Sequence, residues 1–486
     1  MNAEERRSLT AIFALAVSTM GISLSWTGMK LPEMLLGFKF LDMMSGWSMS
    51  YFIIAEVAIM PFAGKLIDMY GTKTPLACGL GLFLAGSAVA MFAEDGNTFL
   101  VGRIVQGLGA GMIFSVSMTA VGLLFRGHAM RRLHGVMTGA FAIGSLFGFA
   151  FGYWICSTVE ADYFVPVCAF IAVSGGVVGY LHLPDSKPCG THDTLGTVLI
   201  TLFMLVIVTF TQTVNKSHDL VSVETATLVA VAVALLAALW FVERRAVDPI
   251  FPRTEGSSLV GCILCMFLAG FCGLGIIQYL TRFLIIGMEM GIYETSSMFL
   301  VFLAGAAITS FGISRVLGRT GLRRWVLVGP VIVFCALLFA SQTLIDGIEY
   351  VGISMLVLGL GLGCIVTPAL CSLHASTRRE ILGSTTSIVL AFRFVGILCG
   401  IAIYAGIISW KLEGVLANLR EIFGHATLDL ITTIMMLIGD VFDGALATLE
   451  DSIMLCCMAA GVLSLSILAA AFFTIEPGFG KDEAED

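Results

Sequence analysis

The amino-acid sequence predicts an all-α polytopic membrane protein, built from two pseudo-symmetric six-helix bundles and two inserted helices. Hydrophobic residues make up 58% of the 486 residues, and charged residues make up only 12%. A soluble chain of this length has no way to bury so much apolar surface, so the composition indicates a membrane protein. The chain also contains many apolar segments of about 20 residues, the length that crosses a bilayer. A loose internal repeat is the third observation.

Fourteen apolar segments are long enough to span the membrane. They cover approximately 9–31, 46–66, 74–93, 98–125, 133–156, 163–183, 195–213, 224–242, 257–281, 293–314, 325–343, 350–373, 383–409 and 451–474. Little of the chain remains outside these segments. The sequence therefore leaves no room for a soluble catalytic domain.

The distribution of basic residues predicts the orientation. With the N-terminus inside, eighteen of the 26 lysines and arginines fall in cytoplasmic segments. This bias is typical of cytoplasmic loops, and an even number of spans then places both termini in the cytoplasm. The first apolar run continues to Met29 without a convincing cleavage site, so we expect an uncleaved first span. We expect a multi-pass protein of the cell (cytoplasmic or inner) membrane.

The repeat relates the two halves of the chain. A polar turn at 64–73 follows the second span, and a similar turn at 314–324 follows the tenth. In this repeat Gly321 corresponds to Gly71. Three further glycines recur 248 positions later: Gly135, Gly148 and Gly152 correspond to Gly383, Gly396 and Gly400. Duplication of one half is the simplest explanation. Many secondary transporters consist of two such bundles around a midplane cavity.

The repeat and the polar stretches divide the chain. We expect one bundle at 1–182, two linker helices with cytoplasmic loops at 183–256, a second bundle at 257–474 and a cytoplasmic tail at 475–486. Within the second bundle, residues 410–450 mix apolar and acidic side chains, and the longest apolar run there is too short to span. We expect this segment to form one or two amphipathic helices on the outer surface.

Two motifs resemble those of a known family. The segment Gly64-x-Leu-x-Asp68-x-x-Gly71-x-Lys73 resembles the loop between spans two and three of the major facilitator superfamily. The segment Gly102-Arg103-x-x-Gln106-Gly107-x-Gly109-x-Gly111 resembles its second motif. Trp47, Tyr51 and the fourteen spans look like its fourteen-span drug:proton antiporter branch. The resemblance covers the whole chain. It implies a secondary active transporter, with proton-coupled, multidrug-type efflux of small amphipathic compounds by alternating access.

The first motif predicts a cytoplasmic gate. Gly64 and Gly71 allow a tight turn and close backbone approach. Asp68 can accept hydrogen bonds from a helix N-terminus or a basic residue; the alternative is a solvated turn carboxylate. We include Lys73 in the gate, and from the second copy Arg319 and Arg323. Met69 and Thr72 stand where the family usually has arginines, which predicts a thinner charge network.

Charged residues inside spans predict proton coupling. Glu56 is the only acid deep in any span, and a carboxylate there is suited to alternate between neutral and charged forms; the alternative is a satisfied polar contact. The resemblance implies that Arg103 takes part in coupling; the alternative is a side chain that snorkels outward. Arg103, Gly107 and Gly111 share one helix face, where the glycines let another helix pack closely.

Other polar residues are candidates for the substrate cavity. These are Gln106, Arg393, Gln278, Tyr279, Trp26 and Tyr51. Arg393 is expected to contact an anionic substrate or the facing bundle, or else to pair with a helix carbonyl. Small residues that we expect at helix contacts are Gly107, Gly111, Gly144, Gly148, Gly396 and Gly400.

Two departures from the antiporter pattern leave other functions open. Ser23 occupies the position of the usual first-span acid, and Gly144-Ser145 stands where a Gly-Pro pair is usual. Both departures favour a facilitator, or a transporter for one specific metabolite, without proton coupling. From a different class, the chain could be a non-transporting membrane sensor, although the tail after Glu476 is short for that.

An enzyme is not indicated. The sequence has no H-E-x-x-H, G-x-S-x-G or P-loop at a usable spacing, and we expect His128 and His134 in a solvated cytoplasmic loop. Cys262 and Cys265 form a C-x-x-C that we interpret as small packing residues; the alternative is a copper or redox site. The expected partners are the lipid bilayer, a small-molecule substrate and protons. We expect no metal, no other cofactor, no nucleic acid, and a monomer.

Overall fold

The computed structural model describes most of the chain, and statements about structure concern that part. The described residues are 3–28, 41–158, 164–184, 194–217, 222–245, 256–277, 279–280, 284, 290, 292–320, 322–343, 348–423 and 439–467.

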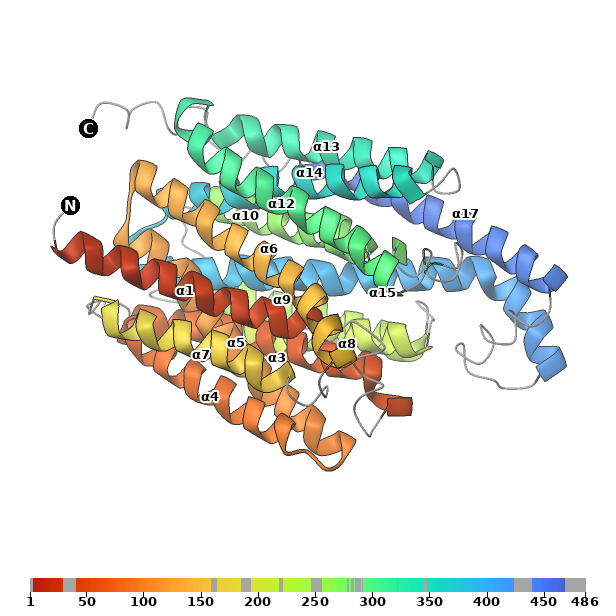
Figure 1. Cartoon of the computed structure of the whole chain (residues 1–486), viewed down its shortest axis with the longest axis horizontal. Coiled ribbons are helices and arrows are strands. Elements are labelled where there is room, and N and C mark those ends of the chain that lie inside the picture. The colour runs from red at the N-terminus through yellow and green to blue at the C-terminus, as the bar shows by residue number, and fades with distance from the viewer. Residues whose placement is uncertain are drawn as a thin grey trace.

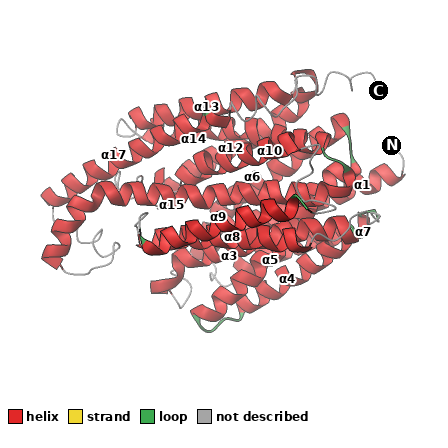
Figure 2. Cartoon of the chain, turned by 180° about the vertical axis from the view of Figure 1, so that it is seen from behind, coloured by secondary structure: helices red, strands yellow, loops and turns green. Residues whose placement is uncertain are grey.

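Fourteen α-helices make up the described part, and it contains no strand (Figure 2). They are α1 (Ala3–Gly28), α3 (Leu41–Tyr70), α4 (Lys73–Met91), α5 (Gly96–Leu124), α6 (Gly127–Thr158), α7 (Phe164–His182), α8 (Thr194–Ser217), α9 (Val223–Glu243), α10 (Gly256–Ala269), α12 (Ile292–Thr320), α13 (Leu322–Thr343), α14 (Ile348–Ser376), α15 (Leu382–Phe423) and α17 (Gly439–Ser464). A π-helical turn, Gly270–Gly275, follows α10, and a 3-10 turn, Arg379–Ile381, precedes α15. Each predicted span corresponds to one helix, which confirms the all-α membrane fold.

The two halves pack in the same way internally. In the first half α3 and α4 both pack against α5, and α4 also packs against α7. In the second half their repeat equivalents do the same, because α12 and α13 pack against α14, and α13 packs against α17. Figure 1 shows α4, α5 and α7 on one side of the bundle and α13, α14 and α17 on the other. This matching pattern supports the duplication that the glycine spacing predicts.

The halves meet through two equivalent contacts. Helix α3 of the first half packs against α15 of the second, and α6 of the first half packs against α12 of the second. The repeat relates α3 to α12 and α6 to α15, so one contact is the counterpart of the other. Helix α8 packs against both α3 and α15, and α9 packs against α8. The inserted pair therefore lies along one junction between the halves.

Helices α15 and α17 both extend into the region 410–450. Helix α15 continues without a break to Phe423, and residues 410–423 contain no proline that would interrupt it. Helix α17 begins at Gly439, well before the predicted start near 451. The two helices are linked where Lys411 Nζ donates a hydrogen bond to the Asp451 carbonyl at 3.4 Å. Residues 424–438 lie outside the described part.

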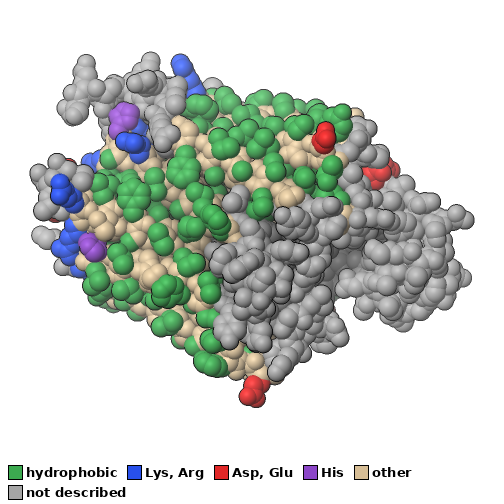
Figure 3. Space-filling model, viewed as in Figure 1, with side chains coloured by type: hydrophobic (Ala, Val, Ile, Leu, Met, Phe, Trp, Pro, Cys, Tyr) green, Lys and Arg blue, Asp and Glu red, His purple; other side chains and the backbone are tan. Residues whose placement is uncertain are grey.

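The surface shows the pattern of a membrane-spanning bundle. Hydrophobic side chains cover the middle in Figure 3, and Lys and Arg side chains gather at the end where α1 begins. The exposed basic residues include Arg6, Arg7, Arg126, Arg132, Arg244, Arg245, Arg324, Arg378 and Arg379. Eight described helices are long and apolar enough to cross a membrane, and two shorter apolar helices add to them. The chain is a multi-pass membrane protein.

Candidate functional site

The turn that follows α3 positions the acid of the first motif. Gly71 adopts a φ of 78°, which L-residues rarely adopt, and its N–H donates to the Ile67 carbonyl at 2.9 Å. The left-handed glycine ends α3 directly after Tyr70. Asp68 consequently lies in the last turn of α3 and faces the second half of the molecule.

The Asp68 carboxylate binds the start of α15. It accepts hydrogen bonds from the backbone N–H groups of Gly383 at 2.8 Å and Ser384 at 2.9 Å, and a third from the Ser384 hydroxyl. The first N–H groups of a helix have no partner within the helix, and the positive end of the helix dipole favours an anion there. Asp68 is buried, so it is not a solvated turn carboxylate.

Two glycines let α3 and α15 approach closely at this contact. A methyl group added at Gly64 would lie 2.6 Å from the Gly383 carbonyl oxygen, and one added at Gly383 would lie 2.6 Å from the Gly64 carbonyl oxygen. No side chain fits between these backbones. Asp68, Gly64 and the start of α15 thus join the two halves at the end of the molecule predicted to be cytoplasmic.

The remaining gate candidates lie away from the Asp68 contact or have side chains outside the described part. The Lys73 ammonium lies 5.9 Å from the centroid of the Tyr180 ring on α7. The side chains of Arg319 and Arg323 are outside the described part. The sequence predicts a helix N-terminus or a basic residue as the partner of Asp68, but it does not indicate which helix, although Gly383 is one of the repeated glycines.

Arg103 is fully buried on α5. Its guanidinium lies over the Phe52 ring of α3, 4.5 Å from the ring centroid, and donates a hydrogen bond to Gln106 Oε1. Gln106 Nε2 in turn donates to Ser87 Oγ on α4 at 2.9 Å, and Ser87 donates to the Phe83 carbonyl at 2.7 Å. The arginine faces into the bundle and does not snorkel outward.

Glu56 follows Phe52, whose ring Arg103 covers, by one helical turn on α3. It is 2% exposed and close enough to Arg103 for the two charges to interact. Its Oε1 accepts no hydrogen bond from any described residue. Methyl groups added at Gly107 and Gly111 would lie 2.3 Å from the Phe52 carbonyl oxygen and 2.5 Å from the Glu56 carbonyl oxygen. Both glycines therefore bring the backbone of α3 against α5, so that a buried acid of α3 and a buried base of α5 lie on helices in close contact.

Several cavity candidates have other surroundings in the structure. Gln106 is completely buried and holds Arg103, and the Tyr279 hydroxyl donates to the Ile401 carbonyl at 2.6 Å. Arg393 on α15 lies 5.7 Å from the centroid of the Phe141 ring on α6, so it faces the other half. Tyr51 is partly buried. The side chains of Trp26 and Gln278 lie outside the described part.

The helix-packing glycines of the second half lie at backbone contacts. A methyl at Gly396 would lie 2.0 Å from the Phe267 carbonyl oxygen, and one at Gly400 would lie 2.9 Å from the Phe271 carbonyl oxygen. These contacts hold α15 against α10 and its π-helical turn. Gly144 on α6 is buried, whereas the surroundings of Gly148 are outside the described part.

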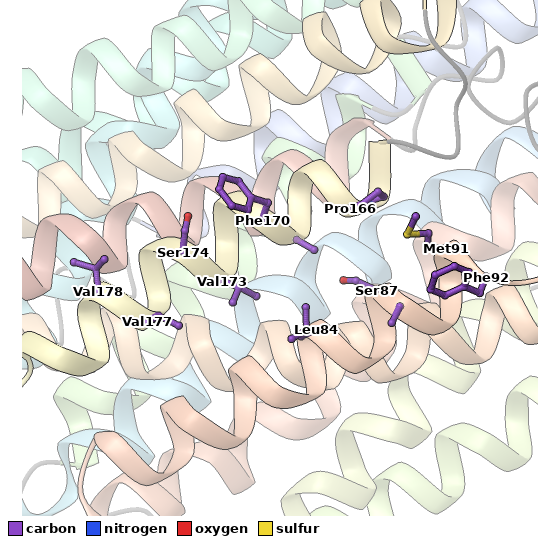
Figure 4. A pocket seen from close by; sticks show the side chains of 12 residues that line it. Leu84, Ser87, Met91, Phe92, Pro166, Phe170, Val173, Ser174, Val177 and Val178 are labelled. Atoms are coloured by element: carbon purple, nitrogen blue, oxygen red, sulfur yellow. The ribbon is translucent and has the colours of Figure 1, made fainter.

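An apolar groove lies between α4 and α7 on the flank of the first half. It encloses about 610 Å³, and Leu84, Phe170 and Val173 are among the residues that line it (Figure 4). Ser87 and Ser174 are the two hydroxyl-bearing side chains in its wall. The groove contains neither Glu56 nor Arg103. Of the residues that line the groove, Ser87 is the one that belongs to the hydrogen-bonded chain of Arg103.

His134 does not lie in a solvated loop. Helix α6 begins at Gly127, so the segment expected to be a loop forms its first turns, and His134 is buried there. Its Nε2 lies 2.9 Å from Nδ1 of His374 on α14. His128, one residue into α6, is exposed as expected, but it is helical. The prediction of a solvated loop is therefore wrong for His134: the residues around position 130 are polar, but the neighbouring half covers one face of this helix.

Comparison with known proteins identifies relatives along most of the chain. The sequence profile of the Major Facilitator Superfamily matches residues 11–401. The multidrug transporter protein MdtP of Bacillus subtilis is 23% identical over 402 residues, which are 80% of this chain and 73% of that protein. Multidrug resistance protein 3 of the same organism is 24% identical over 333 residues, 65% of this chain and 63% of that protein.

A solved structure shares the fold. The human organic anion transporter MFSD10 superposes with a TM-score of 0.68 at 14% sequence identity, over 97% of this chain and 100% of that one. At this identity the similarity concerns the fold alone.

Proposed function

Because this chain belongs to the major facilitator superfamily, and is therefore a transporter and not an enzyme, we propose that it exports small amphipathic molecules in exchange for protons. The low-identity relatives named as multidrug transporters support the substrate class. The membrane concerned is the cell membrane, with both termini in the cytoplasm. This orientation is supported by the basic residues that gather at one end of the bundle.

The single observation that carries the proton coupling is the buried pair Glu56 and Arg103. A carboxylate in an apolar span is costly unless a partner cation or a proton compensates it. When Glu56 is charged, it attracts Arg103; when it is protonated, the attraction is lost. The proton on Glu56 therefore decides how strongly α3 holds α5 at this level. That change gives the proton a way to bias which side of the transporter is open.

The Asp68 contact supplies the alternating step. With the contact formed, α3 and α15 close the cytoplasmic side; with it broken, the two halves can separate there. Substrate enters from the cytoplasm in the separated form. After closure at Asp68, protonation of Glu56 from outside favours release of the substrate outward, and loss of the proton to the cytoplasm resets the cycle.

Transport by reconstituted vesicles tests this function. We expect a lipophilic cation such as a fluorescent dye to accumulate in inside-out oriented vesicles only when the lumen is more acidic than the medium. The gradient should collapse measurably faster when the dye is added, because each exported molecule moves at least one proton. Dye movement that is equally fast with and without the pH gradient would support a facilitator instead.

A further inference from the structure

We propose that His134 and His374 form a second proton-binding site, at the contact between the two halves, and that proton uptake there opens the cytoplasmic side. The inference rests on the alternating access proposed above. It adds a protonatable site to the molecule that neither Glu56 nor Asp68 accounts for.

A chain of hydrogen bonds crosses the junction at this site. His134 Nε2 on α6 lies 2.9 Å from His374 Nδ1 on α14, and His374 Nε2 lies 2.8 Å from Thr386 Oγ1 on α15. Helix α6 belongs to the first half, whereas α14 and α15 belong to the second. The rings are buried and meet edge to face, with centroids 4.5 Å apart. Opening the two halves at this end would separate His134 from His374, while His374 and Thr386 would stay in the same half.

The first half is shaped to receive the His374 ring. A methyl group at Gly122 on α5 would lie 2.2 Å from His374 Nδ1 and 2.8 Å from Cγ of the same ring. Any larger residue at position 122 would displace the ring. The histidine of one half is thus seated between α5 and α6 of the other.

The pair has room for one further proton. If His134 Nε2–H donates to His374 Nδ1, His374 Nε2–H donates to the Thr386 hydroxyl, and His134 Nδ1 is left with a lone pair. This tautomer is the less costly one, because the alternative places a buried N–H at His134 Nδ1, which has no hydrogen-bond partner among the described residues. A first added proton would go to Nδ1, where in the closed form its N–H would again have no partner among the described residues. A second would make both facing nitrogens donors and break the bond between the rings.

The surroundings oppose charge on the rings in the closed form. Arg131, one turn before His134 on α6, is buried and lies close enough to the Cys371 thiol of α14 for its charge to act there. Asp68 of α3 is already held by Ser384 at the start of α15. Helix α5 contributes Gly122 and α15 contributes Thr386, neither of which is charged. A buried imidazolium therefore has a cation nearby and no unengaged carboxylate among these groups.

Protons consequently bind the open form more tightly. When the halves separate, the rings meet water, where an ordinary histidine takes up a proton near pH 6.5. Binding that favours one form shifts the equilibrium toward it, so a fall in pH favours opening. For groups that titrate at about 6.5 in the open form alone, opening increases about tenfold per histidine between pH 7.5 and pH 5.5.

The repeat shows that the carboxylate of the Asp68 contact has no counterpart at the α6–α12 contact. Gly135, beside His134, is the repeat equivalent of Gly383, which donates to Asp68. In the second copy of the polar turn, Gly318 occupies the position of Asp68. The acid is therefore missing at the α6–α12 contact, and the histidine pair lies where that contact borders α14. One junction is held by a carboxylate and the other includes a pair of titratable rings.

Hydrogen–deuterium exchange of the full chain in lipid nanodiscs tests the proposal. Exchange of peptides from the first turns of α6 and α15 is measured at pH 7.5 and 5.5 and corrected for intrinsic chemical exchange. For the wild-type chain we expect at least about tenfold faster corrected exchange at pH 5.5. The double variant His134→Gln/His374→Gln keeps donors and acceptors but does not titrate, and it should lose that response. His128→Gln, an exposed histidine on the same helix, should retain it.

Each result decides the question. A double variant that keeps the wild-type response, which Asp68 would then have to cause, overturns the proposal. A wild-type chain with no pH response overturns it as well, even if the double variant fails to fold. The measurement needs no substrate and no gradient. If proton-driven export failed in vesicles, the exchange measurement would therefore still decide whether the histidine pair controls opening.

Discussion

Replacing Glu56 with glutamine is expected to abolish efflux driven by a pH gradient. The amide has nearly the same shape as the carboxyl group but neither binds nor releases a proton, so Arg103 would be held equally in every step of the cycle. Substrate movement in reconstituted vesicles should fall to the rate seen without a gradient. Exchange of labelled substrate across the membrane, which needs no net proton transfer, should continue.

The matched control for this variant is Glu224→Gln. Glu224 is an exposed acid in the first turn of α9, outside the contacts between the halves. It should leave gradient-driven efflux unchanged. If Glu56→Gln reaches the same level and folds normally, as judged by gel filtration and thermal unfolding, Glu56 is not the coupling residue.

Replacing Asp68 with asparagine is expected to shift the protein toward the form that is open to the cytoplasm. The charged carboxylate accepts three hydrogen bonds from the start of α15, and hydrogen bonds to a charged group contribute about 1.5–3 kcal/mol each against about 1 kcal/mol for neutral ones. An amide has one oxygen acceptor, and its NH₂ group faces backbone N–H donors. A loss of about 1.4–3 kcal/mol increases opening by about tenfold to more than a hundredfold.

Labelling of a cysteine placed in the contact measures this shift. Ser387 lies against Gly64 in the closed form, so the thiol of Ser387→Cys should react with a membrane-impermeant maleimide only when the halves separate. Asp68→Asn should raise the labelling rate by the same factor as the opening.

The control is Asp95→Asn, which removes a carboxylate from a helix start inside the first half, away from the contacts between the two halves. Asp95 caps α5 by accepting from the Thr98 N–H at 2.9 Å and from the Thr98 hydroxyl at 2.6 Å, bonds that hold its pKa below the usual value. This variant should leave labelling of the Ser387→Cys thiol unchanged. Equal labelling rates in wild type and Asp68→Asn would show that the carboxylate does not hold the gate closed.

The sequence predicts the helices and the acids well because each has a local signal. Apolar runs of membrane length define the spans, and the glycine spacing reveals the repeat that the helix contacts reproduce. Glu56 is recognisable because an acid is so rare within a span. Gly71 is recognisable because only a glycine readily adopts the positive φ of the turn.

Such local sequence signals do not predict which residues form hydrogen bonds with the buried polar groups. Gln106 follows Arg103 by three residues, but Ser87, which completes their chain, comes from another helix. His134 sits among polar residues that resemble a loop, and only the packing of the second half shows it to be buried. Hydropathy reports whether a segment is apolar. It does not report which buried side chain of one half meets which side chain of the other.

The most direct test of the central claim is the distance between the two halves at their cytoplasmic ends. Spin labels at position 70, the exposed end of α3, and at position 379, just before α15, would report it by pulsed electron paramagnetic resonance in nanodiscs. We predict two distance populations, with the longer one enriched by Asp68→Asn. A single distance that stays the same in that variant, with substrate and across pH, would contradict the account.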